Sequence, residues 1–453
     1  MILPREAESF ELTRRSLEDR TVTLAYVLHG RGAARIDFEE RLEIPESLGP
    51  LGSAEGGAVA RALLALHVVG GTSYWKTAVP KRLRVDPGAL SREDASLFTD
   101  VYTKGLGEFF FRNGIDPTGA AVFEGSAHGP GDPVRGGGEG PALVLWGGGK
   151  DSVVSERVLA QSGEPHELLT IGRRGWEWIG RSASLTGAPH HVVERRLDPK
   201  LQELNAAGAL NGHVPVSAYL AAAAVLVALL TGRRAVIASN ESSASEGNTT
   251  WRGLDVNHQW SKSLEFERGF RAWLARHVDG GPEYFSLLRP LTELRIVKAF
   301  TSHTRFFTSV TSCNRNFSQT GPAASRWCLT CPKCVFVALM ARPWLDDAAY
   351  HALFGADPLA DPANCALVEE LLGVRGVKPF ECVGTPGETA AALHLAKTRG
   401  IAVPHGCMTV FNDRVAAFRS DLDEVASRAL ARSDEHAIPA RWLAHLDAYL
   451  DRH

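Results

Sequence analysis

The chain has 453 residues, a length that suggests about two or three domains, and it is 44% hydrophobic and 22% charged, which supplies a full core. A formal net charge of −3 gives no general attraction to nucleic acid. The N-terminal stretch is too charged for a signal peptide, and no apolar run reaches membrane-spanning length. We therefore expect a cytoplasmic protein with neither a membrane nor a nucleic-acid partner.

Residues 1–125 are predicted to form a separate N-terminal region of α+β type. Residues 21–28 and 34–44 alternate apolar and polar side chains and are rich in β-branched residues, a pattern typical of an antiparallel hairpin. Helical patterns follow at residues 57–69 and 92–113.

A linker and a glycine-rich turn come next. Residues 126–140 are rich in Gly and Pro and are interpreted as the linker. Residues 142–146 then form an apolar run with the length of a buried parallel strand. The apolar spacing of a helix begins at Val153. Between the strand and the helix stand Gly147, Gly148, Gly149, Lys150, Asp151 and Ser152.

This order of strand, glycine turn and helix is suited to binding phosphate. A helix N-terminus carries free N–H groups and a partial positive charge, and glycines let the backbone approach a ligand closely. Lys150 adds a charge and Ser152 a hydroxyl, whereas Asp151 beside a phosphate suggests a Mg²⁺ contact. The alternative is an ordinary glycine-rich turn between a strand and a helix.

The turn lacks the Walker pattern, because Asp follows the lysine. It resembles instead the PP-loop of the ATP pyrophosphatases, whose pattern is S-G-G-x-D-S. The residues that carry the match are Gly148, Gly149, Asp151 and Ser152. The sequence departs at Gly147, where that family usually has Ser. The resemblance implies an ATP-binding enzyme that forms AMP and pyrophosphate while adenylating a carboxylate or carbonyl oxygen.

Strand and helix patterns alternate after the turn. Strands are predicted at residues 166–171, 190–195 and 235–239, and helices at residues 176–185 and 214–230. We expect an α/β fold over residues 141–342, with a doubly wound parallel sheet of PP-loop (adenine nucleotide alpha hydrolase-like) type. Ligands of such sheets bind beyond the carboxyl ends of the strands. Arg173 and Arg174 after one strand, and Asn240 and Glu241 after another, should therefore face the ATP site.

A long polar stretch, residues 240–265, leads into a predicted helix that ends near His277. Loops of this length in a compact domain usually serve function. The stretch contains His258 and Lys262, which are candidate acid–base groups. The alternative is a solvated loop in which Ser261 or Ser263 caps the helix.

All seven cysteines lie between Cys313 and Cys407, which argues for metal or thiol chemistry rather than disulfides. Four of them form one distal Cys followed, after fourteen residues, by C-x-x-C-x-x-C. This spacing predicts a closed tetrahedral zinc site of structural type, and a redox or persulfide role for one C-x-x-C pair is the alternative. The four candidate ligands are Cys313, Cys328, Cys331 and Cys334. From about residue 143 to residue 334 the chain is similar to the 7-cyano-7-deazaguanine synthase subgroup, which lacks the two terminal regions.

Residues 343–453 are predicted to be mostly helical, with one unusual loop. The loop reads KPFECVG and spans residues 378–384. Its Cys382, flanked by Glu381 and near a glycine, is a candidate acid–base thiol. A small buried residue without chemical function is the alternative.

Together these motifs resemble the UDP-N-acetylmuramoyl-L-alanyl-L-glutamate epimerase family over nearly the whole chain. The resemblance rests on LWGGGKDS (residues 145–152), NHQWSKS (residues 257–263), the cysteine cluster and KPFECVG. It implies inversion of the terminal L-glutamate of the nucleotide-linked dipeptide, for peptidoglycan and hence cell-wall synthesis. It also implies dependence on ATP and Mg²⁺, with ATP converted to AMP and pyrophosphate.

The chemistry of such an inversion fits these residues. The α-proton of a carboxylate is very weakly acidic, and an acyl-adenylate acidifies it by removing the negative charge. Inversion then needs one or two acid–base groups. We expect Cys382 to be one of them, with His258 or Lys262 as the other. Candidate anchors for the anionic substrate are Arg173, Arg174 and Arg315.

Two other functions stay open at this point. A PP-loop synthetase would adenylate a carboxylate for amidation or thiolation, but no glutaminase-like domain is visible. A nucleotide sensor would bind ATP and make no AMP. The expected partner is a small nucleotide-sugar dipeptide, and a homo-oligomer is left open.

Overall fold

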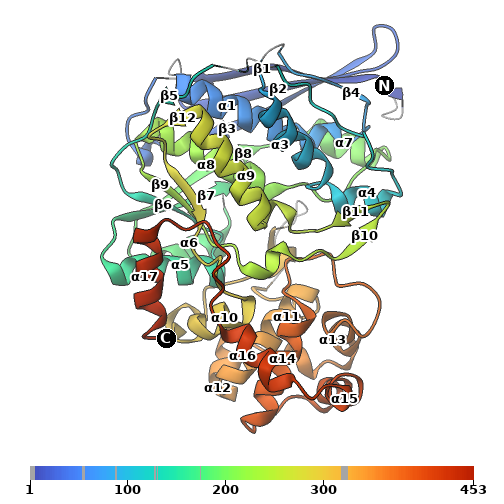
Figure 1. Cartoon of the computed structure of the whole chain (residues 1–453), viewed down its shortest axis with the longest axis vertical. Helices are drawn as coiled ribbons and strands as arrows, with labels where there is room; N and C mark the ends of the chain where they lie inside the picture. Colours follow the sequence, from blue (N-terminus) through green and yellow to red (C-terminus); the bar gives the residue numbers. More distant parts are fainter. Residues whose placement is uncertain are drawn as a thin grey trace.

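The computed structural model describes residues 6–53, 57–86, 89–126, 129, 131–173, 175–317 and 325–453. A nine-stranded sheet runs through the molecule (Figure 1). Its strands are β1 (Ser9–Glu18), β2 (Thr21–His29), β3 (Arg35–Glu43), β4 (Arg82–Arg84), β6 (Ala142–Leu145), β7 (His166–Gly172), β8 (His190–Arg196), β9 (Ala235–Ala238) and β13 (Glu283–Ser286). Two short ladders in the described part lie outside it, β5 (Val134–Arg135) with β12 (Val278–Asp279), and β10 (Thr249–Trp251) with β11 (Leu254–Val256).

The sheet combines a parallel and an antiparallel part. The spatial order of its strands is β13-β9-β6-β7-β8-β3-β2-β1-β4. All neighbours from β13 to β8 are parallel, and β4 is parallel to β1. The pairs β8–β3, β3–β2 and β2–β1 are antiparallel. The expected α/β class with a large, mostly parallel sheet is confirmed.

Both faces of the parallel part are buried. Strands β6 and β9 read ALVL and AVIA, continuous apolar runs of the kind that are covered on both sides. Along β6, Ala142 and Val144 join the core on one face, whereas Leu143 joins the core on the other. The helices that precede the C-terminal region are α1 (Gly57–Gly70), α2 (Thr72–Trp75), α3 (Arg92–Thr103), α4 (Gly107–Asn113), α5 (Lys150–Ser162), α6 (Glu177–Ser184), α7 (Lys200–Ala206), α8 (Val216–Thr231), α9 (Leu264–His277) and α10 (Glu293–Thr301).

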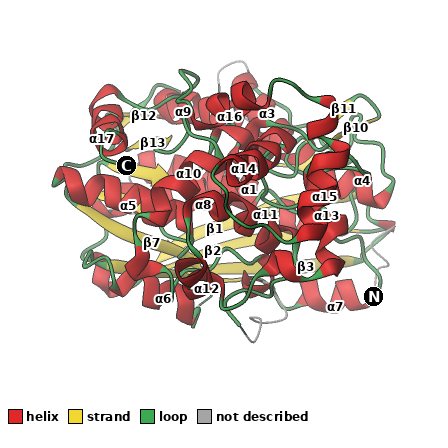
Figure 2. Ribbon diagram, turned by 90° about the horizontal axis from the view of Figure 1, so that it is seen from below, coloured by secondary structure: helices red, strands yellow, loops and turns green. Residues whose placement is uncertain are grey.

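Helices α5 and α10 pack on the first face and α1, α8 and α9 on the second (Figures 1 and 2). From β6 the chain builds β7 and β8 on one side and β9 and β13 on the other. The direction of winding therefore reverses between β6 and β9. In such sheets the loops that leave the carboxyl ends at this reversal separate and form a crevice for a ligand.

The predicted N-terminal hairpin is confirmed as β2 and β3, which pair from Thr21 with Glu43 to His29 with Arg35. The hairpin is continuous with the parallel strands, because β3 pairs with β8. Strand β5 lies within the stretch interpreted as a linker and pairs with β12. The division of the chain into residues 1–125, 126–140, 141–342 and 343–453 stays a prediction.

The single helix expected over residues 92–113 is two helices, α3 and α4, with Gly105 between them. A Cβ at Gly105 would lie 2.3 Å from the carbonyl oxygen of Val101 and 2.9 Å from Pro215. Only glycine fits this close approach, so the chain bends there. The bend brings α4 close to β11.

The C-terminal region is helical, as expected. Its helices are α11 (Pro332–Ala341), α12 (Asp347–Phe354), α13 (Cys365–Leu371), α14 (Pro386–Thr398), α15 (His405–Arg414), α16 (Leu422–Leu430) and α17 (Ala440–Leu450). Most of them form a group below the sheet, whereas α17 returns to pack against α5 (Figure 1). Across the described ranges, no helix combines the length and apolar character that a membrane span requires.

Candidate active site

The glycine turn between β6 and α5 is tight and leads directly into the first turn of a helix. Gly148 has a φ of +68°, and a Cβ there would lie 2.9 Å from the Cα of Ile179, so only glycine fits. Gly149 is the N-cap of α5, and no side chain caps the helix. The first N–H groups of α5 are therefore left for a ligand.

A cavity of about 410 Å³ opens beside this turn. Its walls come from the carboxyl ends of β6, β7 and β9, the start of α8, and the segments that carry Lys262, Lys333 and Cys382. Trp146, Trp176 and other apolar side chains line part of it. The cavity thus lies at the reversal of the sheet and offers both an apolar wall and polar groups, as small-molecule sites do.

Five of the eight residues expected to bind ATP line this cavity. They are Gly147, Gly149, Asp151, Ser152 and Asn240. Asn240 also donates a hydrogen bond of 2.9 Å to the hydroxyl of Ser286. Gly148 allows the tight turn, because its backbone lies so close to Ile179 that a side chain would not fit.

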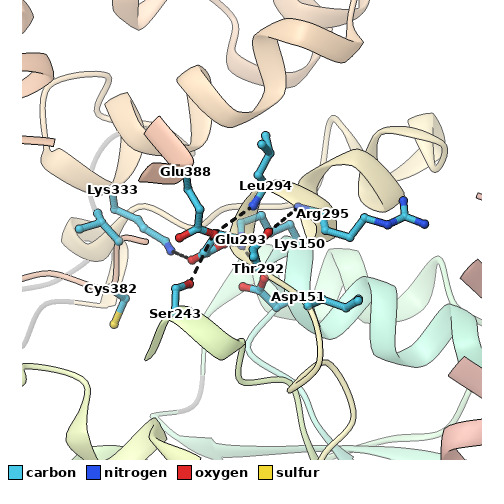
Figure 3. Close-up of polar contacts among 12 residues, drawn as sticks. Lys150, Asp151, Ser243, Thr292, Glu293, Leu294, Arg295, Lys333, Cys382 and Glu388 are labelled. Carbon is cyan, nitrogen blue, oxygen red and sulfur yellow. Dashed lines mark hydrogen bonds and ion pairs between the residues drawn. The ribbon is translucent and has the colours of Figure 1, made fainter. Parts of the chain in front are cut away.

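Lys150 lies behind the cavity wall, although a phosphate contact was expected. Its ammonium is 1% exposed and forms ion pairs with Asp151 and Glu293. Lys333 reaches the same carboxylate from α11, with Nζ 2.7 Å from Oε1 of Glu293. Figure 3 shows the two lysines flanking Glu293, with Cys382 on the side of Lys333. Burial favours a higher pKa for Glu293, but the charges of Lys150 and Lys333 outweigh it and lower this pKa to about 2.

Glu241 is also buried, close to these charges. Burial, together with the charge of Glu293, raises the pKa of Glu241 to about 7. Its Oε1 has no hydrogen-bond partner among the described residues. A carboxyl group in this state can take up a proton or meet a cation near neutral pH.

Cys382 is the candidate reactive group of the site, because cationic side chains surround its sulfur. The ammonium of Lys262 donates a hydrogen bond of 3.1 Å to its sulfur. Burial works to raise the pKa of this thiol, but the charge of Lys262 and the interaction with the His258 imidazole lower it to about 5. The predicted trio of Cys382, His258 and Lys262 is thus brought together, with the sulfur in the form of a thiolate at neutral pH.

Lys262 and His258 are both cationic in this arrangement. Burial works to lower the pKa of Lys262, but the charges of Cys382 and Glu241 raise it above its ordinary value. Burial likewise opposes the charge on His258, but the interactions with Cys382 and Glu108 raise the pKa of its imidazole to about 9. The thiolate of Cys382 is thus accompanied by two cations.

Two functional residues were missed from the sequence. Glu108 of α4 lies with Oε2 2.5 Å from Nδ1 of His258, and nothing in the local sequence marked it. Lys333 lines the cavity between two cysteines of the C-x-x-C-x-x-C run. Its place inside that motif is the signal that could have identified it.

The four predicted zinc ligands converge. The sulfurs of Cys313, Cys328, Cys331 and Cys334 all lie within 4.8 Å of one another, and those of Cys328 and Cys334 are 3.8 Å apart. Zn–S bonds of about 2.3 Å in a tetrahedron place two sulfurs about 3.8 Å apart. The donor set therefore fits zinc in spacing and chemistry.

The cysteine cluster is joined to the loop that carries Cys382. Oε2 of Glu381 accepts hydrogen bonds from the backbone N–H of Lys333, at 3.1 Å, and from Nδ2 of Asn314, at 3.0 Å. Lys333 and Asn314 are each next to a cysteine of the cluster. The loop is thereby docked on the segments that hold the four sulfurs.

The predicted anchors lie elsewhere. Arg173 follows β7 and is exposed, and Arg315 is exposed with Nη1 3.1 Å from the hydroxyl of Thr330. Neither is among the described residues that line the cavity. Arg174 lies outside the described residues.

Comparisons with known proteins agree along the chain. A family model described as the MurL N-terminal domain matches residues 1–287, and one described as the MurL C-terminal domain matches residues 309–424. The chain is 37% identical over 441 residues to UDP-N-acetyl-alpha-D-muramoyl-L-alanyl-L-glutamate epimerase of Xanthomonas oryzae pv. oryzae, covering 96% of each chain. It is 42% identical to proteins of the same name from Salinispora tropica, over 79% of this chain and 78% of the relative, and from a Micromonospora species, over 79% of each.

Proposed function

The chain belongs to the MurL epimerase family, and from this premise we propose that it inverts the terminal L-glutamate of UDP-N-acetylmuramoyl-L-alanyl-L-glutamate. The product would carry D-glutamate and serve peptidoglycan synthesis. The observation that carries the proposal is the place of Cys382, which lies 3.1 Å from the ammonium of Lys262 in the wall of the cavity that also contains the glycine turn. In this proposal, the glycine turn that would activate a carboxylate and the thiol that would abstract a proton lie in the same cavity.

Activation by ATP is the first part of the proposed reaction. The substrate carboxylate would attack the α-phosphate of ATP, forming an acyl-adenylate and releasing pyrophosphate, as the resemblance to the PP-loop enzymes implies. The N–H groups at the start of α5 and the hydroxyl of Ser152 suit the phosphates. Lys262 and Lys333 add positive charge in the cavity wall.

The start of α5 carries a ligand suited to the proposed Mg²⁺ ion. The Asp151 carboxylate lines the cavity, and carboxylate with phosphate oxygens is the ligand set that Mg²⁺ prefers. The ion would neutralise phosphate charge when bound. Asn240 and Glu241, which follow β9, complete the proposed nucleotide side of the site.

Inversion is the second part. Formation of the mixed anhydride with AMP removes the negative charge of the carboxylate and so acidifies the proton on Cα. The thiolate of Cys382 would take that proton, a protonated group would return one to the opposite face, and water would release AMP from the acyl group. His258 and Lys262 are the candidates for the returning acid. After the return, the spent acid can take the proton from the Cys382 thiol, which restores the thiolate and the acid together; Lys262 contacts the sulfur and His258 interacts with the thiol.

The remaining site residues have supporting roles in the proposal. The four-cysteine cluster would hold a structural zinc ion that fixes the segment bearing Lys333. Arg173, Arg174 and Arg315 stay candidate anchors for the anionic nucleotide-sugar part. Arg173 and Arg315 are exposed, as the outer end of a long substrate would require.

The test uses purified protein with ATP, Mg²⁺ and the nucleotide-linked dipeptide in D₂O. Release of AMP, deuterium at the glutamate Cα, and D-glutamate after hydrolysis are expected. AMP without deuterium would point instead to a synthetase that adenylates a carboxylate for amidation or thiolation. ATP binding without AMP would point to a nucleotide sensor. The variant Cys382→Ala should still fold and release AMP but incorporate no deuterium, and unchanged exchange would remove Cys382 from the mechanism.

A further inference from the structure

Glu108 is a buried carboxylate that reaches from the N-terminal region to His258, a candidate acid of the proposed reaction. It lies on α4, its side chain is 7% exposed, and its Oε2 is 2.5 Å from Nδ1 of His258. Its other oxygen accepts a hydrogen bond of 2.5 Å from Nε of Arg112, one turn further along α4. Both oxygens are therefore engaged, and the carboxylate is held in one orientation on its own helix.

His258 is fixed from several sides. Its backbone N–H donates to Oδ1 of Asn248 at 2.9 Å. Its ring packs against the ring of His213, with centroids 4.3 Å apart. The carboxylate on Nδ1 fixes the orientation of the ring, which leaves Nε2 as the ring nitrogen available to the Cys382 sulfur.

The contact between Glu108 and His258 has the length of a hydrogen bond. An imidazole nitrogen and a carboxylate oxygen bound to one tetrahedral ion, with bonds of about 2.0–2.1 Å, would lie about 3.3 Å apart. The separation between Oε2 of Glu108 and Nδ1 of His258 is 2.5 Å. With His213, these residues also bring three possible metal ligands within 4.8 Å of one another.

Three distant parts of the chain thus form one relay. Glu108 precedes His258 by 150 residues, and Cys382 belongs to the C-terminal region. We infer that Glu108 is a positioning residue that keeps His258 protonated and oriented against the Cys382 sulfur, so that the N-terminal region supports proton transfer at the substrate Cα. This inference rests on the proposed function for its reaction, but the titration of the thiol tests it independently.

The other charges around the relay are accounted for. Cys382 also faces Lys262, Lys333 and Glu381. His213 is held neutral, because burial and the charge of His258 lower its pKa to about 3. The charge of Lys76, which donates to Asn211 at 2.6 Å, also works to lower the pKa of His213. None of these groups replaces the negative charge that Glu108 places on the imidazole.

The test compares Glu108→Gln, Glu108→Asp and a matched control in the full-length protein. The control is Asp116→Asn, which removes a carboxylate of the same region that is paired with Arg252 at the surface. Alkylation of Cys382 by iodoacetamide, followed at the level of the peptide across pH, reports the thiolate. Deuterium incorporation at Cα and AMP release report the two proposed parts of the reaction.

In Glu108→Gln the midpoint of alkylation should rise by about one pH unit or more, because the imidazolium loses its anionic partner. Deuterium incorporation at neutral pH should fall by about tenfold or more, whereas AMP release persists. Glu108→Asp should restore part of both signals, and Asp116→Asn should match the wild type. Retained AMP release shows that the variant is folded.

An unchanged midpoint and exchange rate in Glu108→Gln would overturn the inference. If Glu108→Gln does not fold, an unchanged midpoint in Glu108→Asp would do the same. Failure of the wild type to exchange Cα would instead refute the proposed function. In that event a raised midpoint in Glu108→Gln would still support the relay, and an unchanged one would still overturn it.

Discussion

The ammonium of Lys262 lies 3.1 Å from the sulfur of Cys382. The two residues are 120 positions apart and both line the cavity beside the glycine turn. A cation at this distance favours the thiolate over the thiol. The reactivity of Cys382 is therefore a property that can be measured before any substrate is at hand.

Cys382 should be alkylated with a midpoint near pH 5, because Lys262 and His258 lower the pKa of a thiol that burial alone would raise. A free cysteine titrates at about 8.5. The variant Lys262→Met should raise the midpoint by about one unit or more. Mass spectrometry of the Cys382 peptide after short iodoacetamide pulses measures both values. A wild-type midpoint above pH 8 would contradict the thiolate assignment.

Glu293→Gln should destabilise the fold by about 3–5 kcal/mol at neutral pH, because it leaves Lys150 and Lys333 without their shared buried anion. Urea unfolding measures the change. The exposed Glu265, which pairs with Lys104, supplies the control Glu265→Gln, for which a change below about 1 kcal/mol is expected. Equal losses of unfolding free energy in the two variants would show that burial does not increase the contribution of the ion pairs of Glu293.

The difference between the wild type and Glu293→Gln should shrink in acid. The pKa of Glu293 is lowered to about 2 by Lys150 and Lys333, against the opposing effect of burial. Its stabilising contribution is thus complete above an unfolded pKa of about 4.3 and is lost as the pH falls towards the folded value. Unfolding free energies of both proteins at pH 7, 4 and 3 would measure this, and a constant difference would argue against an ionised Glu293.

Gly148→Ala should destabilise the turn by about 1–3 kcal/mol, because alanine meets both a positive φ and the backbone of Ile179. Gly147 provides the matched control. A Cβ there has no described atom within 4 Å, and its φ is not positive. Gly147→Ala should therefore change the free energy of unfolding by less than about 0.5 kcal/mol. Similar losses in both variants would mean that the tight approach at Gly148 is absent in solution.

The purified protein should contain about one zinc ion per chain, bound by the four clustered sulfurs. Elemental analysis measures the ion, and Cys331→Ser should lower both zinc content and the midpoint of thermal unfolding. Cys365→Ser, outside the cluster, is the control and should keep the metal. Four rapidly reacting thiols and no metal in the native protein would favour the redox alternative.

The sequence allowed the local parts of the site to be predicted. The turn from Gly147 to Ser152 and the four-cysteine spacing are each set by neighbouring residues, so their pattern carries their geometry. The parallel strands were recognisable because continuous apolar runs alternate with helical patterns. The loop of Cys382 was recognisable as a candidate from its Cys beside Glu381 and a glycine, and the family resemblance strengthened that prediction.

The long-range parts could not be predicted in this way. Lys150 was expected to contact phosphate, but its charge is paired with Glu293, which lies 143 residues away. Glu108 contacts His258 across 150 residues, and no local pattern reports such a meeting. The bend at Gly105 depends on Pro215, which comes from another segment. Each of these features depends on packing between segments that are far apart in the sequence. The periodicity of side chains along one segment does not reveal such contacts.

The pairing of β3 with β8 also limits how the chain can be truncated. Removing residues 1–125 would convert β8 into an open edge whose unpaired N–H and C=O groups invite association with other chains. The same truncation would take Glu108 from His258. A shortened fragment kept for its nucleotide site would therefore tend to aggregate and would lack part of its proton relay, so engineering of this enzyme must keep the first strands.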